Sequence, residues 1–165
     1  KMQVFDLALA INQLYQQDVI DPVLIPKFKN NTIEFDLAPS AELRSNQVDP
    51  MKWVYHDWLV QYFIQYPSHN MIDWLKTYLT GDWKKTEVAD WMVYYGLDNP
   101  KNFIEDIRWF MKSWHSAIFK RIQFPPIVTI SRGSFGYDYR ESQIPYIENT
   151  EVKELIDQIL KGANI

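Results

Sequence analysis

The stretch DWLVQYFIQYPSHNMIDWLKTYLTGDWKKTEVADWMVYY, residues 57–95, decides the fold because it repeats one helical phrase three times. Each repeat is Asp-Trp, then an apolar residue, then a Tyr four positions after the Trp. The repeated Trp residues lie 16 and 17 positions apart, about one short helix plus a turn, and are Trp58, Trp74 and Trp91. Side chains at i and i+4 share a helix face, and apolar helix faces are usually buried. The pattern predicts stacked helices with an aromatic seam in the core.

Helix and strand signals continue on both sides of the repeats. An amphipathic helix is expected over 4–19, with an apolar face made of Val4, Leu7, Ala8, Ile11, Leu14 and Tyr15. Capping residues, prolines and glycines predict further helices over 49–65, 68–80, 86–96, 99–121 and 150–162. Alternating or β-rich runs predict short strands within 30–37, 127–132 and 143–148.

The expected fold class is α+β and mainly α. We expect a compact bundle of about five or six helices with a small antiparallel sheet or hairpin. Strands on both sides of the helical block favour one domain over residues 1–165. Its helical core would span about 49–122, and a strand-loop-helix segment, 126–162, would pack on that core.

Composition excludes several classes of protein. With 47% hydrophobic and 16% aromatic residues, the 165-residue chain has enough apolar area for a core, so disorder is not expected. The absence of cysteine excludes disulfides, thiolate metal sites and a Cys nucleophile. No apolar run reaches the ~18 residues of a membrane helix, and the first residues do not resemble a secretory signal. These features predict a soluble, cytoplasmic protein that does not bind membranes.

The net charge of −4 is unevenly distributed along the chain. Residues 101–140 hold seven bases and three acids, whereas the chain as a whole is acidic. In the loop SRGSFGYDYR, residues 131–140, arginines alternate with aromatic residues, a pattern that binds protein surfaces or stacks on nucleic-acid bases. The same loop also suits a hairpin, in which Gly133 and Gly136 supply positive φ.

We therefore expect a non-enzymatic domain that binds a macromolecular partner through an aromatic and basic surface around 101–140. The residues expected to form this surface are Lys112, Lys120, Arg121, Arg132, Phe135, Tyr137, Tyr139 and Arg140. A protein partner is favoured, nucleic acid is the second choice, and homo-oligomerisation stays open.

A second hypothesis rests on Arg108 and His115 in the sequence RWFMKSWH. They are seven positions apart and share a helix face. This spacing resembles the Arg-x6-His motif of HEPN ribonucleases, helical proteins that act on RNA at a dimer interface. The resemblance implies that His115 is the acid/base and that Arg108 stabilises phosphate charge, without a metal. Trp109 departs from the polar residue expected after the Arg.

Other motifs are weaker. The helix-turn-helix outline of residues 86–110, with 127–140 as a wing, is a third hypothesis, that of a DNA-binding regulator, but it carries Glu105 and Asp106 where base contacts are wanted. His56-Asp57 is similar to the dyad of HD-domain phosphohydrolases, yet no earlier His completes a metal set, so an ordinary pair on a helix surface is expected. No cofactor or metal is predicted.

Overall fold

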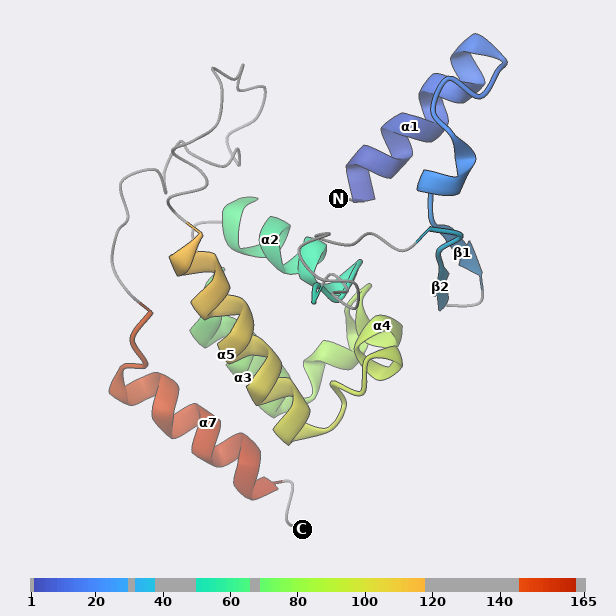
Figure 1. Cartoon of the computed structure of the whole chain (residues 1–165). Coiled ribbons are helices and arrows are strands. Elements are labelled where there is room, and N and C mark those ends of the chain that lie inside the picture. Colours follow the sequence, from blue (N-terminus) through green and yellow to red (C-terminus); the bar gives the residue numbers. More distant parts are fainter. Residues whose placement is uncertain (1, 30–31, 38–49, 66–68, 118–145, 163–165) are drawn as a thin grey trace. The chain divides into compact units, whose positions relative to one another are not determined.

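The computed structural model describes residues 2–29, 32–37, 50–65, 69–117 and 146–162 (Figure 1). Contacts divide the chain into two compact units, Lys1–Asp57 and Trp58–Ile165. The described residues form α-helices α1 Met2–Tyr15, α2 Tyr55–Gln65, α3 Met71–Thr80, α4 Ala89–Tyr94, α5 Pro100–Ser116 and α7 Thr150–Gly162. The mainly α fold with a small hairpin is confirmed. A single domain over 1–165 stays a prediction.

The first unit contains α1, a 3-10 turn at Pro22–Leu24, and a hairpin of β1 Lys27–Lys29 with β2 Thr32–Glu34. The strands are antiparallel, and Phe28 faces Ile33 in their register. Trp53 is buried between two rings, with Phe5 stacked at 5.2 Å and Phe35 edge-on at 4.9 Å. This ring cluster attaches one face of α1 to the rest of the unit.

A polar clamp holds the end of α1 in the same unit. The Asn12 side chain donates to the Ile20 carbonyl at 2.7 Å and accepts from the Ile20 amide at 2.8 Å. The clamp fixes the chain after the helix, where Gln16 adopts a positive φ of 53°. Two hydrogen bonds from the Asn12 side chain thus hold the connection between α1 and Ile20 in place.

The second unit has its core where α3, α5 and α7 pack together. Its central contact is the stack of Tyr78 on Phe103, with ring centroids 3.7 Å apart. The Tyr78 hydroxyl lies 2.9 Å from the carbonyl oxygens of both Leu97 and Asp98. Other buried side chains of this core are Leu75, Trp83, Val88, Met92, Ile104, Ile107, Phe110, Val152, Leu155, Ile156 and Ile159.

The aromatic repeats are buried to different degrees. Trp74 is fully buried, with 0% exposure, whereas Trp58 and Trp91 are half-buried. The Trp58 ring lies 4.9 Å from Trp74, and its Nε1 donates to Glu87 at 2.6 Å. The expectation of a buried seam is therefore correct for Trp74. Trp58 and Trp91 are less buried than expected, because part of each side chain stays in contact with solvent.

Helix boundaries follow the predicted caps in part. Asn99 caps α5 by accepting from Lys101 N and Asn102 N, and Gly81 closes α3 with a φ of 79°, both as predicted. The cap of α3 is Asn70, in a capping box with Asp73, and not Ser68.

Several helix ends differ from expectation. The helix expected from residue 49 begins only at Tyr55, and the helix expected to reach residue 19 ends at Tyr15. Thr150 lies inside α7, because Asn149 accepts from Val152 N at 2.9 Å. The α5 helix ends at Ser116, earlier than the predicted residue 121. The third repeat helix is shorter than predicted at its start, because a 3-10 turn, Asp82–Lys85, is closed by the Thr86 hydroxyl bonding to Trp83 O.

The strand predictions are only partly met. The strand expected within 30–37 corresponds to β2, and β1 was not predicted. Residues 146–149 form no strand, so the prediction over 143–148 is wrong for its described part. The strand expected over 127–132 lies outside the described residues.

Candidate functional site

The α5 helix presents the predicted residues Arg108, Lys112 and His115 along one side of its second half. Arg108 makes a two-pronged ion pair with Glu148, at 2.6 Å from Nε to Oε1 and 3.0 Å from Nη2 to Oε2. Side-chain exposure is 38% for Arg108 and 18% for Glu148, so the pair is partly shielded from water. Bidentate geometry of this kind is stronger and more directional than an ordinary surface pair.

Two further residues extend this ion pair. The Tyr146 hydroxyl lies 3.3 Å from Glu148 Oε1 and 3.3 Å from Met71 Sδ, and donates to one of them at a time. The His115 ring centroid lies 6.0 Å from that of Tyr146. Arg108, His115, Tyr146 and Glu148 therefore form one group, the Arg108 cluster, which joins α5 to the segment that leads into α7.

The electrostatics of the Arg108 cluster follow from its hydrogen bonds. The guanidinium of Arg108 lowers the pKa of Glu148 by donating hydrogen bonds to its carboxylate. The same bonds raise the pKa of Arg108, while burial and then the charge of Glu148 raise the pKa of Tyr146. At neutral pH, Arg108 and Glu148 therefore carry opposite charges that cancel each other, and Tyr146 is a neutral hydrogen-bond donor. A phosphate would have to displace Glu148 to take both prongs of Arg108.

The structure separates the predicted site residues into two groups. Arg108, Lys112 and His115 are described, and Lys112 is exposed on α5. Seven predicted binding residues lie outside the described residues: Lys120, Arg121, Arg132, Phe135, Tyr137, Tyr139 and Arg140. Sequence reasoning missed Tyr146 and Glu148, because no local spacing links residue 108 to a partner 40 positions away.

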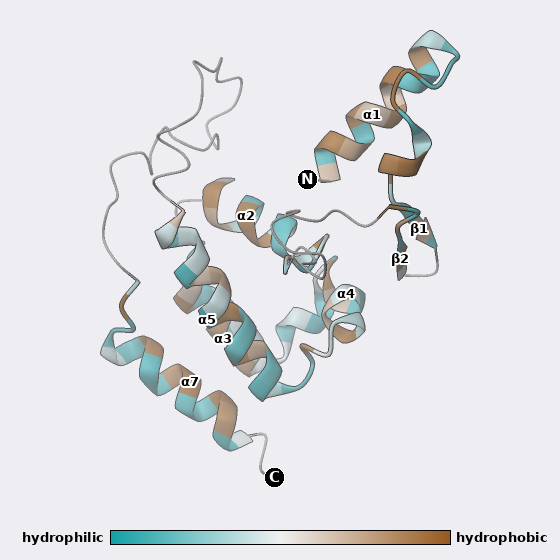
Figure 2. Cartoon of the chain, viewed as in Figure 1, coloured by the Kyte–Doolittle hydropathy of each residue, from teal (hydrophilic) through white to brown (hydrophobic). Residues whose placement is uncertain are grey.

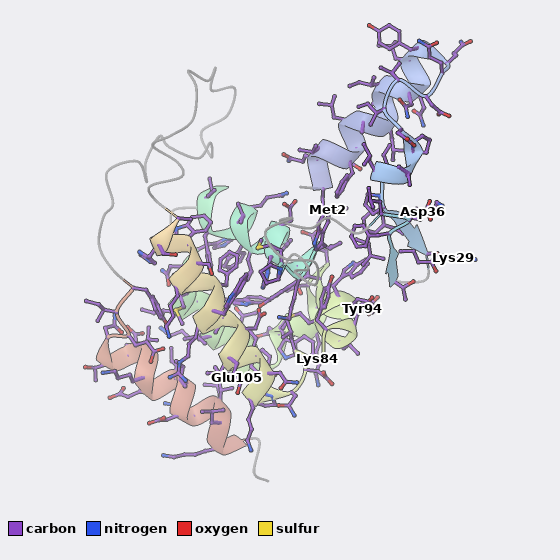
Figure 3. The ribbon with its side chains drawn as sticks, in the orientation of Figure 1. Met2, Lys29, Asp36, Lys84, Tyr94 and Glu105 are labelled. Atoms are coloured by element: carbon purple, nitrogen blue, oxygen red, sulfur yellow. The ribbon has the colours of Figure 1, made fainter. Side chains whose placement is uncertain are left out.

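A different aromatic surface lies on α4, at the third repeat. Val93 and Tyr94 are 55% and 44% exposed, and Trp91 and Tyr95 are half-buried. The Tyr94 ring packs edge-on against Trp91 at 5.6 Å and against Tyr95 at 4.8 Å. Figure 3 labels Tyr94 on this short helix. We call Trp91, Val93, Tyr94 and Tyr95 the α4 surface.

Acidic residues accompany the α4 surface in the chain. Between residues 86 and 100 there are three acids, Glu87, Asp90 and Asp98, and no Lys or Arg. Glu87 accepts a hydrogen bond from the indole of Trp58, which is not a basic group. Of the two lysines just before this stretch, Lys85 is paired with Asp82 at 2.6 Å. Aromatic rings in an acidic stretch of the chain favour a ligand that is both cationic and apolar.

The remaining motifs occupy ordinary structural positions. His56, expected on a helix surface, is instead fully buried, and its Nδ1 accepts from Lys52 N at 2.9 Å. The helix-turn-helix outline corresponds to α4, a turn with Gly96 at a φ of 68°, and α5, and its predicted wing lies outside the described residues.

Some kinds of site are not found in the part of the chain that the structure describes. Within those ranges, no three His, Asp or Glu side chains gather in a way that could hold a metal ion. No described helix is long and apolar enough to cross a membrane. Comparison of the chain with protein-family models, curated proteins and solved structures finds no match in any of the three. Its function is therefore argued from its own residues.

Proposed function

We propose that this chain is a non-enzymatic binding domain for a protein partner, and that its main contact is the α4 surface. The single observation that supports this is the exposure of Val93 and Tyr94 on one six-residue helix, where the Tyr94 ring packs on the half-buried rings of Trp91 and Tyr95. Exposed Trp and Tyr are enriched in protein interfaces, where they bury large area at a low entropic cost. Scattered single apolar residues would carry no such meaning.

The partner segment is cationic and partly apolar. The stretch that carries the α4 surface has three acids and no base, which attracts Lys or Arg. Cations also bind over the faces of Trp and Tyr, with a gain of about 0.5–1 kcal/mol at exposed sites. An arginine or lysine of the partner would thus meet rings and carboxylates together, and its neighbours would cover Val93.

The basic segment 101–140 is the second contact in this proposal. Its support is the seven bases against three acids and the alternation of arginine with aromatic residues. Lys112, exposed on α5, belongs to this segment. Alanine at Arg132, Tyr137 and Arg140 would weaken a partner that uses both contacts. If every partner interaction survived that triple change, the second contact would be wrong and the α4 surface would stand alone.

The primary contact is tested with two labelled 12-residue peptides, one alternating Arg with Leu and one alternating Glu with Leu. Fluorescence anisotropy at 50 and 200 mM salt measures their binding to the full chain. We expect the arginine peptide alone to bind, and more weakly at high salt, because the attraction is electrostatic and partly exposed. Equal binding of both peptides, or binding of neither, would exclude the proposed partner chemistry.

Matched variants locate that binding. Trp91→Ala with Tyr94→Ala should weaken the arginine peptide by about tenfold or more, as expected when two interface aromatics are truncated. Tyr15→Ala removes a similarly exposed ring from the first unit and should leave affinity unchanged. An equal loss in both variants would place binding elsewhere. Circular dichroism of each variant shows whether the fold is retained.

A metal-independent ribonuclease is the second candidate. One observation favours it: Arg108 pairs with Glu148, Glu148 also contacts Tyr146, and the ring of Tyr146 lies 6.0 Å from that of His115, so an acid/base and a cation lie at one partly exposed place. Such an arrangement can transfer a proton and stabilise charge on a phosphodiester. Against it, the Arg108 guanidinium is already neutralised by Glu148.

The ribonuclease candidate predicts cleavage of single-stranded RNA in EDTA. His115→Ala should abolish cleavage, whereas Lys112→Ala, one turn away on α5, should leave most of it. Because Glu148 competes for Arg108, Glu148→Gln should raise the rate. If purified chain does not cleave RNA, or the His115→Ala variant cleaves it as well as the parent chain, this candidate is removed and the binding proposal is unaffected.

A further inference from the structure

The α1 helix carries a heptad pattern that goes beyond the proposed function. Val4, Leu7, Ile11 and Leu14 follow one another at steps of three, four and three residues, which are the a and d positions of two heptads. The a positions are the β-branched Val4 and Ile11, and both d positions are Leu. This choice of side chains is the one that favours two parallel helices over three or four. We call these four residues the α1 seam.

The α1 seam is exposed. Val4, Leu7 and Leu14 are 65%, 60% and 76% exposed, and Ile11 is half-buried. In a coiled coil, the side chains at these positions pack into holes between the side chains of the partner helix. In Figure 3, Met2 marks the start of the helix.

The first unit holds α1 by a different face. Phe5 stacks on Trp53, Ala8 is buried, and Asn12 clamps Ile20. At 100° per residue, positions 5 and 12 point about 140° and 120° away from the centre of the seam, and Ala8, an e position, points about 80° away from it. The contacts that fold the unit therefore leave the seam accessible, and a partner helix would not have to displace them.

The residues beside the seam suit an identical partner. The flanking e and g positions within α1 are Gln3, Ala8, Ala10 and Tyr15, none of which is an acidic or basic residue. Charged e and g residues set partner choice through interhelical salt bridges, and like charges at facing positions repel. Here two identical helices meet without like-charge repulsion. The one carboxylate of the helix, Asp6, occupies a c position away from the contact.

We propose that α1 pairs with α1 of a second copy of this chain as a parallel two-stranded coiled coil. Two heptads are too short to dimerise as free peptides, because helix formation itself is unfavourable. Here α1 is already formed on its unit, so association does not have to order it. The contact is smaller than the ~800 Å² per partner of a standard interface, so the dimer is weak, with a micromolar dissociation constant. It brings two α4 surfaces onto one particle and strengthens binding to repeated ligands.

Analytical ultracentrifugation of the full chain from about 1 to 300 µM tests the pairing, a range chosen around a micromolar constant. The parent chain should pass from monomer to dimer across this range. Leu7→Glu with Leu14→Glu should stay monomeric throughout, with an unchanged melting temperature, since both side chains are exposed in the single chain. Leu9→Glu, also exposed but at an f position off the seam, should still dimerise.

Cysteine cross-linking tests the parallel register, because the natural chain has no cysteine. Val4→Cys chains should form disulfide-linked dimers on mild oxidation, whereas Leu9→Cys chains should not. A mixture of Val4→Cys and Leu14→Cys chains should give no cross-link between the two kinds. Efficient mixed cross-linking would indicate antiparallel helices and overturn the proposal.

Three other results would also overturn it. One is a parent chain that is monomeric at every concentration. Another is a Leu9→Glu variant that loses the dimer as completely as the seam variant does. The third is a large fall in melting temperature for the seam variant at concentrations where the parent is monomeric, because this would mean that the chain itself covers the seam. Failure of peptide binding at the α4 surface would leave this proposal unaffected.

Discussion

The α1 and α7 helices have similar lengths and one apolar stripe each, yet only α7 is covered by its own unit. In α7 the stripe residues Val152, Leu155, Ile156 and Ile159 are all buried. In α1 the stripe residues Val4, Leu7 and Leu14 are among the most exposed large side chains that the structure describes. Figure 2 shows apolar and polar residues alternating along both helices. An amphipathic pattern therefore identifies the apolar face of a helix but does not show which surface covers that face.

The two helices differ because their units offer different amounts of apolar surface that can pack against them. The second unit offers α3 and α5, whose buried side chains face α7 over its length. The first unit offers a hairpin of two three-residue strands and one central ring, Trp53, which stacks on Phe5 at a single face of α1. A small unit buries a smaller share of its surface than a large one. Its surplus apolar face is then available for another molecule.

The largest expected difference in stability comes from truncating one residue of the apolar stripe of α7 and one of the stripe of α1. Ile156→Ala should lower the free energy of unfolding by about 2–5 kcal/mol, because it leaves a cavity in the core. Leu14→Ala should change it by less than about 0.5 kcal/mol, since the side chain is solvated in the single chain. Urea unfolding followed by circular dichroism, at a concentration where the chain is monomeric, measures both. Similar losses would mean that the stripes are not in different environments.

Removal of the Tyr78 hydroxyl, which contacts two backbone carbonyls in the second unit, should have the next largest effect on stability. Tyr78→Phe removes the hydroxyl that lies within hydrogen-bonding distance of the Leu97 and Asp98 carbonyls. We expect a loss of about 1–3 kcal/mol, because buried carbonyls lose their donor while the ring stack on Phe103 remains. Tyr94→Phe, at the exposed α4 surface, is the matched control and should be neutral by the same urea measurement. A neutral Tyr78→Phe would show that water replaces the hydroxyl.

A smaller, pH-dependent effect belongs to the ion pair that leads into α7. Glu148→Gln should lower stability at pH 7 by about 1 kcal/mol, the upper range for a partly exposed pair. The folded-state pKa of Glu148 is lowered by Arg108. Its contribution is therefore present above the unfolded pKa of about 4.3 and is lost as pH falls through the folded value.

Unfolding curves at pH 7, 5, 4 and 3 measure this dependence. The difference between the parent chain and Glu148→Gln should shrink on acidification. Glu154→Gln, on the exposed side of α7, should show no such difference at any pH. A difference that persists undiminished at pH 3 would contradict an electrostatic origin.

The smallest expected effect concerns the ion pair between α3 and α7. Lys76 and Glu151 are 2.8 Å apart, but each side chain is 53% exposed. Such pairs contribute little because water and salt screen them. Lys76→Ala should therefore unfold like the parent chain in urea, at both low and high salt. A measurable loss would mean that charge, and not only apolar burial, holds α7 on its unit.

Local signals predicted the helices well because they act within a few residues. Asn99 caps α5 and Gly81 closes α3 through contacts with immediate neighbours, so the sequence alone identifies both. Thr150 was the wrong cap by one position, since Asn149 offers an equivalent acceptor. The predicted strand over 143–148 failed in its described part, where Tyr146 and Glu148 instead make side-chain contacts with α5 and α3.

Candidate site residues were predictable only where chemistry was local. The sequence singled out Arg108 by its seven-residue spacing from His115, and the structure shows a bidentate partner for it. That partner, Glu148, lies 40 residues away and no spacing rule could find it. The exposure of Val93 and Tyr94 was equally hidden, because the third repeat carries the same Asp-Trp phrase, with a Tyr four positions after the Trp, as the second repeat, whose Trp74 and Tyr78 are buried.

By itself, the sequence determined the helical repeats, the Asn99 cap of α5, the glycine stop of α3, the two-heptad pattern of α1 and the balance of charge along the chain. These depend on backbone preferences and on side-chain periodicity, which neighbouring residues set. Tertiary structure alone decided that Trp74 is buried while Trp91 is half-exposed, that Arg108 is paired, and that α7 is covered while α1 is not. Burial and pairing depend on which distant surface is close by, and that information is not contained in any local stretch.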